Sequence, residues 1–246
     1  MFLWKKRRAA IQTVSLSLFR FPTVAARLWV LGQMALARLA FANMPDVTFW
    51  KLCGSGSGEG FTPRPNTQVW AILAVWPSPE LARKHVESAG VYNRWRARAS
   101  ESLTLYLTPT TARGSWARTT PFQPAPVAGT GPIAALTRAT LKPKVLPHFW
   151  TRVPDISQAI GQDPNVLFKI GIGEIPWLHQ VTFSIWPNAA SMAHFARRDG
   201  PHAHAIQAVR DGQWFREELY ARFAIQGQTG SWGGQPLLAQ NESKVS

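Results

Sequence analysis

Cysteine and acidic residues are scarce in this chain. Its 246 residues include one cysteine, Cys53, so an internal disulfide framework is excluded and a reducing compartment is expected. Asp and Glu number 13 against 27 Lys and Arg, which gives a formal net charge of +14. The few, scattered carboxylates give no support to paired-carboxylate or Ser-His-Asp catalysis. The basic excess favours a nucleic acid, an anionic lipid surface or an acidic protein as partner, without choosing among them.

Residue spacings that build common metal and nucleotide sites are also missing. The chain has no His-x-x-x-His and no Cys-x-x-Cys, which argues against a zinc or non-haem iron site made of side chains. The glycine-rich run 53–60 is followed by the sequence FTP, where a phosphate loop needs Lys and Ser/Thr. We interpret the run as a loop between strands, or as a cover over a ligand channel that includes Glu59. Cys53 is interpreted as a small buried apolar residue rather than a thiolate ligand of haem.

Long apolar runs are absent as well. Residues 119–137 and 223–241 carry no charge, but prolines interrupt the first stretch, and glycine and glutamine interrupt the second. Neither stretch predicts a membrane-spanning helix. The basic start, Met1–Arg8, has the charge of a signal peptide, but polar residues interrupt the segment after it. We predict a basic tail over residues 1–11 of a cytoplasmic protein.

A three-part motif occurs twice, in the same order. Its first copy consists of residues 47–49, Trp76-Pro77 and Gly114-Ser115-Trp116, and its second of residues 166–168, Trp186-Pro187 and Gly230-Ser231-Trp232. A period of roughly 110–120 residues is too long for a solenoid unit. The pattern therefore predicts two fused copies of one small domain.

Hydrophobic periodicity predicts the same element order in both copies. The first copy has expected strands at 11–21, 47–53, 68–76 and 103–108, and expected helices at 25–43 and 79–100. The second has expected strands at 141–152, 166–173, 179–186 and 219–226, and expected helices at 155–161 and 188–211. The order β-α-β-β-α-β is that of a ferredoxin-like unit. We therefore predict two tandem ferredoxin-like repeats, 12–116 and 139–233, packed as an α+β barrel, with a Pro/Gly-rich linker at 117–138 and a tail at 234–246.

Two of the six histidines are predicted to point inward. His202 shares a helix face with Ile206 and Val209, and His179 shares a strand face with Val181, Phe183 and Ile185. His148 is a weaker third candidate, whereas His85, His194 and His204 are expected at the surface. A buried histidine is more often a hydrogen-bonded core residue than a ligand. One inward histidine among Trp and Phe is nevertheless what a haem requires of its protein.

Several segments resemble one known family. These are residues 13–21 (TVSLSLFRF), 27–37 (RLWVLGQMALA), 49–66 (FWKLCGSGSGEGFTPRPN) and 214–223 (WFREELYARF). Together they are similar to the spheroidene monooxygenases, the carotenoid 2-ketolases of purple photosynthetic bacteria. The resemblance extends from about residue 13 to residue 232.

The resemblance implies an activity, a cofactor and partners. It implies haem b, O₂, reduced ferredoxin as electron donor, and oxidation at C-2 of an acyclic carotenoid. It also implies that the ligand histidine lies on the helix of the haem-bearing half, which identifies His202 as the first choice for proximal ligand and leaves His179 as the second. Arg197 and Arg198 are candidate contacts of a haem propionate, although a solvated helix face is the favoured interpretation of the two.

The implied substrate also bears on localisation. A carotenoid enzyme without a spanning helix must collect its substrate at a membrane, so we predict peripheral binding to an anionic inner or intracytoplasmic membrane through Trp4 and the basic tail. Two other functions stay open. One is an α+β barrel monooxygenase without haem. A more remote one is a basic RNA-binding module, although the aromatic signature of such modules is missing and no nucleic-acid partner is expected.

Overall fold

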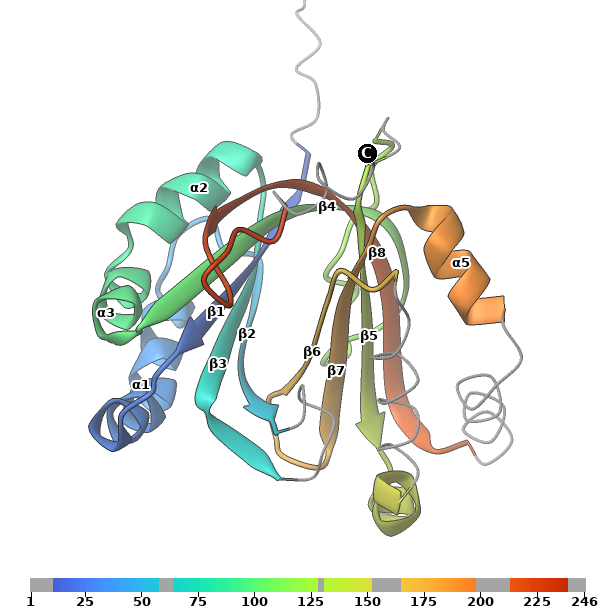
Figure 1. Cartoon of the computed structure of the whole chain (residues 1–246), viewed down its shortest axis with the longest axis horizontal. Helices are drawn as coiled ribbons and strands as arrows, with labels where there is room; N and C mark the ends of the chain where they lie inside the picture. The colour runs from blue at the N-terminus through green and yellow to red at the C-terminus, as the bar shows by residue number, and fades with distance from the viewer. Residues whose placement is uncertain (1–10, 58–63, 128–130, 152–164, 198–212, 239–246) are drawn as a thin grey trace, which may run out of the picture.

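The protein forms one closed barrel of eight antiparallel strands with helices on its outside (Figure 1). The computed structural model describes residues 11–57, 64–127, 131–151, 165–197 and 213–238. The strands are β1 Thr13–Arg20, β2 Phe49–Gly56, β3 Pro65–Trp76, β4 Glu101–Gly114, β5 Ile133–Leu141, β6 Phe168–Gly173, β7 His179–Trp186 and β8 Phe215–Gly230. The helices are α1 Val24–Ala42, α2 Pro79–Ser88, α3 Gly90–Arg98, the short 3-10 helix η1 Pro143–Val145 and α5 Ala189–Arg197, and residues 146–151 are helical as well.

The two halves of the chain contribute the two halves of the barrel. Around the barrel the strand order is β1-β3-β2-β6-β7-β5-β8-β4. The first half therefore supplies the contiguous order β4-β1-β3-β2, and the second half supplies β8-β5-β7-β6. The predicted α+β barrel is confirmed. The helix expected at 155–161 lies outside the described residues, so the origin of the halves by duplication stays a prediction.

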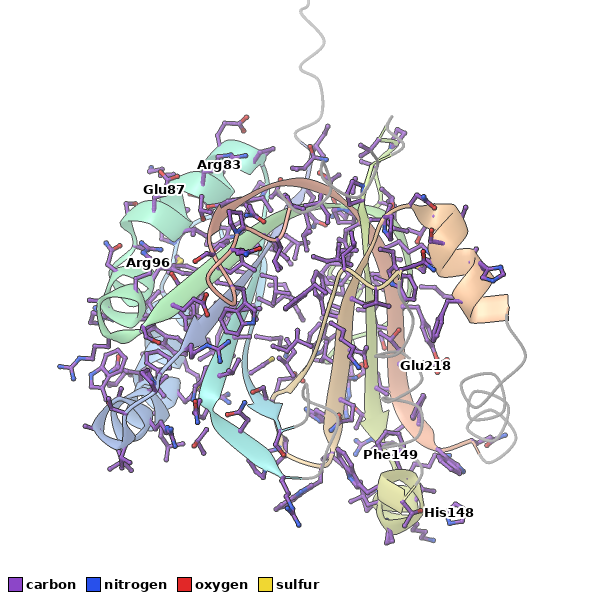
Figure 2. The ribbon with its side chains drawn as sticks, viewed as in Figure 1. Arg83, Glu87, Arg96, His148, Phe149 and Glu218 are labelled. Atoms are coloured by element: carbon purple, nitrogen blue, oxygen red, sulfur yellow. The ribbon has the colours of Figure 1, made fainter. Side chains whose placement is uncertain are left out.

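The interior of the barrel is a packed core. Side chains alternate across each strand, and those that point inward are mostly aliphatic, among them Leu16, Leu73, Leu105, Leu136, Val181 and Phe223. All of these are at most 2% exposed, and Figure 2 shows the barrel filled with side chains. Any large ligand must therefore bind outside this core or at its ends.

The outer faces of the two halves differ. Helices α1, α2 and α3 cover the first half (Figure 1), where Trp70, Ile72 and Trp76 of β3 pack in an aromatic cluster with Phe41 and Trp95. On β7, Trp186 points outward as Trp76 does and packs against Phe195 of α5, with ring centroids 5.1 Å apart. The other outward positions of β5 and β7 include small and polar side chains: Ala135, Thr137, Ala139, Thr182 and Ser184. These residues point outward because they have the opposite parity to the inward-pointing Ala134 and Leu136 of β5 and Val181 and Phe183 of β7.

Two sequence predictions require correction. The strand predicted at 141–152 is wrong, because β5 covers Ile133–Leu141, Pro143 begins a 3-10 turn and residues 146–151 are helical. Proline lacks the N–H that a strand ladder needs, and the Ala- and Thr-rich β5 resembles a linker in composition. The boundary predicted at 138 therefore falls inside a strand. The helix predicted at 79–100 is divided at Ala89, whose ψ of 135° is extended.

Each half of the chain also contributes contacts to an ion pair that lies within the other half. Arg138 of β5 donates to Glu217 of β8, and Glu217 accepts from Ser115 Oγ at 2.9 Å and from the Arg118 amide at 2.7 Å in the turn after β4. In the mirrored arrangement, Arg20 of β1 donates to Glu101 of β4. Glu101 in turn accepts from the Gly234 amide in the turn after β8, and Trp232 of that turn lies under the Arg20 guanidinium. The repeated Gly-Ser-Trp sequences thus join the halves.

The glycines of these turns are required by geometry. Gly114 has φ +100° and Gly230 has φ +79°, in the left-handed region that side chains with a Cβ disfavour. A Cβ at Gly114 would lie 2.1 Å from the carbonyl oxygen of Glu218, and one at Gly230 would lie 2.1 Å from that of Ser102. The paired strand is therefore too close to leave room for a side chain at either glycine.

Acid is expected to destabilise the fold through Glu217. Burial alone raises the pKa of this carboxyl, but the Arg118 amide, the Ser115 hydroxyl and the Arg138 guanidinium outweigh it and lower the pKa to about 2. A depressed pKa gives stability that is present above the ordinary value near 4.5 and is lost as the pH falls through 2. We expect urea unfolding at pH 5, 4, 3 and 2.5 to show a loss of about 2–3 kcal/mol from this group.

Glu217→Gln should flatten that pH dependence. Glu218→Gln is the matched control, because Glu218 is exposed and points away from the barrel on β8 (Figure 2). If the free energy of unfolding of the Glu217 variant falls with pH as steeply as that of wild type, Glu217 is not the group responsible.

Candidate active site

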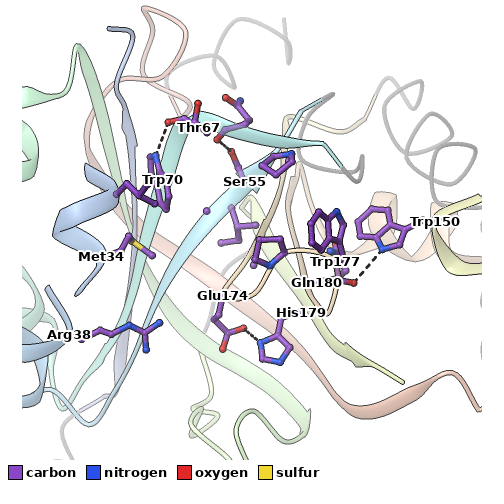
Figure 3. Close-up of a pocket in the computed structure, with 18 residues that line it drawn as sticks. Met34, Arg38, Ser55, Thr67, Trp70, Trp150, Glu174, Trp177, His179 and Gln180 are labelled. Carbon is purple, nitrogen blue, oxygen red and sulfur yellow. Dashed lines mark hydrogen bonds and ion pairs between the residues drawn. The ribbon is translucent and has the colours of Figure 1, made fainter. Parts of the chain in front are cut away.

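A cavity of about 320 Å³ lies between α1 and the hairpin that joins β6 to β7. Leu31, Met34 and Arg38 of α1 line one side, and Trp177 and Trp150 line the other (Figure 3). The remaining wall comes from the ends of β2 and β3, including Gly54, Ser55, Gly56 and Trp70. Its volume is within the range of small-molecule sites, and its wall is mainly apolar and aromatic, as in most such sites.

Polar groups gather at Glu174, in the connection after β6. Its carboxylate accepts from Trp116 Nε1 at 2.8 Å and lies 3.5 Å from Lys51 Nζ. His179 Nδ1 lies 3.2 Å from Glu174 Oε2 (Figure 3). That distance is typical of an ion pair, although the two atoms are not aligned as a regular hydrogen bond. Glu174 and His179 both line the cavity, so the apolar space has a charged end.

Glu174 is ionised at neutral pH. Burial raises the pKa of the carboxyl, but the His179 and Trp116 side chains and the Lys51 ammonium outweigh that effect and lower the pKa to about 2. The group is therefore an acceptor throughout the physiological range. It can orient the His179 imidazole and hold it against the cavity.

The cavity adjoins the narrowest seam of the barrel. In the described part of the chain, β2 and β6 pair only through Gly54 with Gly173 and Ser55 with Ile172. A second cavity, of about 490 Å³, is lined by Ser55 and Gly56 from one side of the seam and by Phe168 and Lys169 from the other. Both cavities share Ser55, Gly56 and Asn66. Gly54 and Gly56 of β2 thus line a cavity at the point where β2 pairs with β6.

The histidines fall partly where the sequence placed them. His179 shares the inward face of β7 with Val181 and Phe183, as predicted, and the structure places it at the cavity. His194 is exposed, also as predicted, and His148 is exposed beside Trp214 at the end of the second half (Figure 2). His202 and His204 lie outside the described residues.

The surface position predicted for His85 is wrong. This side chain is buried, stacks on Trp76 with ring centroids 5.0 Å apart, and lies with Nε2 3.1 Å from Asp46 Oδ2. The bulky outer face of β3 and an acidic partner distant in sequence account for its burial. Neither was visible in the pattern of α2 alone.

The other predicted site residues have mixed outcomes. Cys53 is a free, fully buried thiol in the barrel core, and burial raises its pKa, so its interpretation as an apolar core residue is confirmed. Gly54 and Gly56 belong to β2 and line the cavity, whereas Glu59 lies outside the described residues. The side chains of Arg197 and Arg198 also lie outside the described part.

Sequence reasoning missed Glu174 and two of its partners, Lys51 and Trp116. They come from β2, the turn after β4 and the β6–β7 connection, which are far apart in the chain. The one available signal was Trp116, which belongs to the repeated Gly-Ser-Trp motif. Within the described ranges no cluster of three or more His, Cys, Asp or Glu could hold a metal ion.

Helix α1 meets the length and hydropathy criteria for a membrane-spanning helix, a possibility that the sequence patterns did not indicate. Core helices and signal sequences pass the same test. In the fold, Val30, Ala37 and Phe41 of this helix are buried against the first half of the barrel. The helix thus packs on the barrel along one side, while most of its residues stay exposed or half-buried.

The barrel defines the class of protein. Aldoxime dehydratase has a similar structure, with a TM-score of 0.61 and 12% sequence identity over 89% of this chain and 84% of that one. The structure of an aldoxime dehydratase in complex with butyraldoxime gives the same TM-score, with 11% identity over 88% of this chain and 80% of that one. This chain is thus an α+β barrel of the ferredoxin-like class, and at this identity the similarity concerns the fold alone.

The curated relatives show the family. The chain is 54% identical to the spheroidene monooxygenase of Cereibacter sphaeroides over 94% of its own length and 72% of that protein. It is 53% identical to the enzyme of Rhodobacter capsulatus over 92% and 95%, and 32% identical to that of Rubrivivax gelatinosus over 86% and 81%. No family model matches the chain. The chain belongs to the spheroidene monooxygenase family.

Proposed function

We propose that this protein is a haem-dependent monooxygenase that oxidises C-2 of acyclic carotenoids of the spheroidene type. The observation that carries the proposal is identity above 50% to two spheroidene monooxygenases over more than nine tenths of the chain. O₂ is the oxygen source and reduced ferredoxin the electron donor. Oxidation proceeds through the alcohol to the ketone.

The described cavity supports a long apolar substrate. Leu31, Met34, Trp70, Trp150 and Trp177 offer hydrocarbon and aromatic surface, which favours a polyene over a polar ligand. A volume of about 320 Å³ accepts one end of such a chain rather than its whole length. Since C-2 lies near one end of the carotenoid, the reacting carbon is in the part that enters.

The second half of the barrel suits haem better than the first. Haem is a flat, bulky group, and the outer face of β5 and β7 bears Ala135, Thr137, Ala139 and Thr182, with Trp186 packed against Phe195 at one end. The corresponding face of the first half is filled by tryptophans under three helices. The small side chains fit a planar group between the sheet and the helix that begins with α5, the helix predicted to continue to His202.

The chain's own residues would bind and orient the reactants. His202 is proposed as proximal ligand, with Arg197 or Arg198 as propionate contacts. A haem held there supplies the activation of O₂. The aromatic wall of the cavity excludes water from the carotenoid end, and Glu174 fixes the imidazole of His179 at the border of that space.

Oxygen labelling tests the proposal. The purified full chain, supplied with haem, reduced ferredoxin and detergent-dispersed spheroidene under ¹⁸O₂, should give a product that carries ¹⁸O at C-2, as identified by mass spectrometry. Turnover by haem-free protein would favour a cofactor-free α+β barrel monooxygenase instead. No product from haem-loaded protein would contradict the proposed reaction.

Localisation follows from the substrate. We propose a cytoplasmic protein that binds a membrane peripherally, because a carotenoid is too apolar to cross water freely. The basic tail, Met1–Arg8, stays a predicted contributor to that binding through attraction to anionic lipid.

A further inference from the structure

The exposed face of α1 is almost wholly apolar. Ten of its residues are exposed, and Arg38 is the one polar residue among them. Five of the ten are large aliphatic residues between 54% and 69% exposed: Val24, Leu28, Leu31, Leu36 and Leu39. A contiguous exposed apolar patch of this kind marks an interaction site rather than ordinary surface.

Packing fixes which face of α1 points outward. Val30, Ala37 and Phe41 are buried in the aromatic cluster of the first half, and Phe41 stacks on Trp50 with ring centroids 5.4 Å apart. The helix is thus held on the barrel by its opposite side. The leucines are left exposed because the fold already has a complete core beneath this helix.

The apolar surface continues across the mouth of the cavity. Leu31 lines the cavity from α1, and Trp177 lines it from the β6–β7 connection. Trp177 is 52% exposed and the nearby Ile175 is 47% exposed. Figure 3 shows Met34 and Arg38 on one side of the cavity and Trp177 and Trp150 on the other. The exposed leucines and the exposed tryptophan therefore flank one entrance.

The exposed charges on α1 and α3 have one sign. Neither α1 nor α3, which packs against it, contains an acidic residue. Arg38 is exposed on α1, and Arg94 and Arg98 are exposed on α3. Apolar side chains flanked by arginines, with tryptophan at the edge, are the composition of an interfacial helix on anionic lipid.

We propose that Val24, Leu28, Leu31, Leu36, Leu39, Ile175 and Trp177 form a docking surface for an anionic lipid bilayer. In this orientation α1 lies in the plane of the membrane, and the cavity opens toward the acyl chains. A hydrocarbon ligand then enters without crossing water. That this ligand is a carotenoid rests on the proposed function, whereas the docking itself does not.

Vesicle flotation of the full chain tests the docking surface. Wild type should float with vesicles of phosphatidylcholine and phosphatidylglycerol, and less with phosphatidylcholine alone. Leu28→Glu/Leu39→Glu should lower the bound fraction about tenfold or more, because two apolar contacts are lost and two repelled charges are added. Neither residue lines the cavity. Ile11→Glu/Tyr220→Glu is the matched control, since both residues are exposed elsewhere, and it should float as wild type does.

Further measurements separate the alternatives. Removal of Met1–Arg8 should leave flotation that still depends on Leu28 and Leu39. Equal flotation of the leucine variant and wild type would overturn the proposal. A wild-type dimer that becomes monomeric in the leucine variant, with flotation unchanged, would instead identify a surface between two copies.

An activity assay distinguishes docking from the reaction. The leucine variant should keep its turnover of detergent-dispersed spheroidene and lose turnover of vesicle-embedded spheroidene. Loss in both assays by a folded variant would contradict a role limited to docking. Absence of turnover in wild type would count against the proposed function, while the flotation results would stand.

Discussion

His202→Ala is expected to remove the Soret absorption band of the haem-loaded protein together with its oxygenase activity. The reason is that a single histidine holds the iron from the protein side in the proposed site, and Ala offers no ligand atom. Absorption spectra of variants purified from cells with ample haem supply measure the effect. Far-ultraviolet circular dichroism verifies that the variant keeps its fold.

The other histidines provide controls for this assignment. His194→Ala and His204→Ala should keep the band, because His194 is exposed and His204 is predicted on the solvated side. His179→Ala should keep it too, since this imidazole is already held against Glu174. Loss of the band in the His179 variant alone would move the ligand to β7.

Arg138→Met should lower the free energy of unfolding by about 3–5 kcal/mol, because it leaves the Glu217 carboxylate without its buried partner. The Arg138 side chain is 2% exposed and lies over the Trp116 ring. Methionine keeps the aliphatic length but removes the charge. For a chain of this size the loss corresponds to roughly 10 °C in melting temperature, measurable by circular dichroism.

Arg20→Met is the matched control from the other half. Arg20 makes the equivalent pair with Glu101, but its side chain is 37% exposed. Water screens such a pair, so the expected cost is about 1 kcal/mol or less. Equal losses in the two variants would show that burial does not distinguish the pairs.

The sequence predicted most elements because their patterns are strong. Strand β7 was predicted at its observed bounds, and α1 within one residue at each end, since apolar periodicity and a nearby proline define them. Strand β5 was missed because it is rich in alanine and threonine, a composition that is also common in linkers. Its partners, β7 and β8, lie later in the chain.

The site was less predictable than the fold. The inward direction of His179 follows from a period of two and was confirmed. The meeting of Glu174, Lys51 and Trp116 depends on closure of the barrel, which joins strands from both halves. The exposed leucines of α1 have the same periodicity as core residues, so only the packed helix reveals which side faces outward.

The barrel is unevenly fastened around its circumference. Strands β4 and β8 are paired from Leu103 with Gly230 to Gly114 with Leu219, whereas Gly54 with Gly173 and Ser55 with Ile172 join β2 to β6. The β4–β8 seam is therefore the more rigid one, and the β2–β6 seam is the weaker one. Local opening costs least free energy where the fewest ladder hydrogen bonds must break. Among the strand pairs of the barrel, amide hydrogen exchange should therefore be fastest where β2 pairs with β6. Both of these residue pairs border the cavity, so we expect the cavity wall at the β2–β6 seam to open more readily than the long β4–β8 ladder.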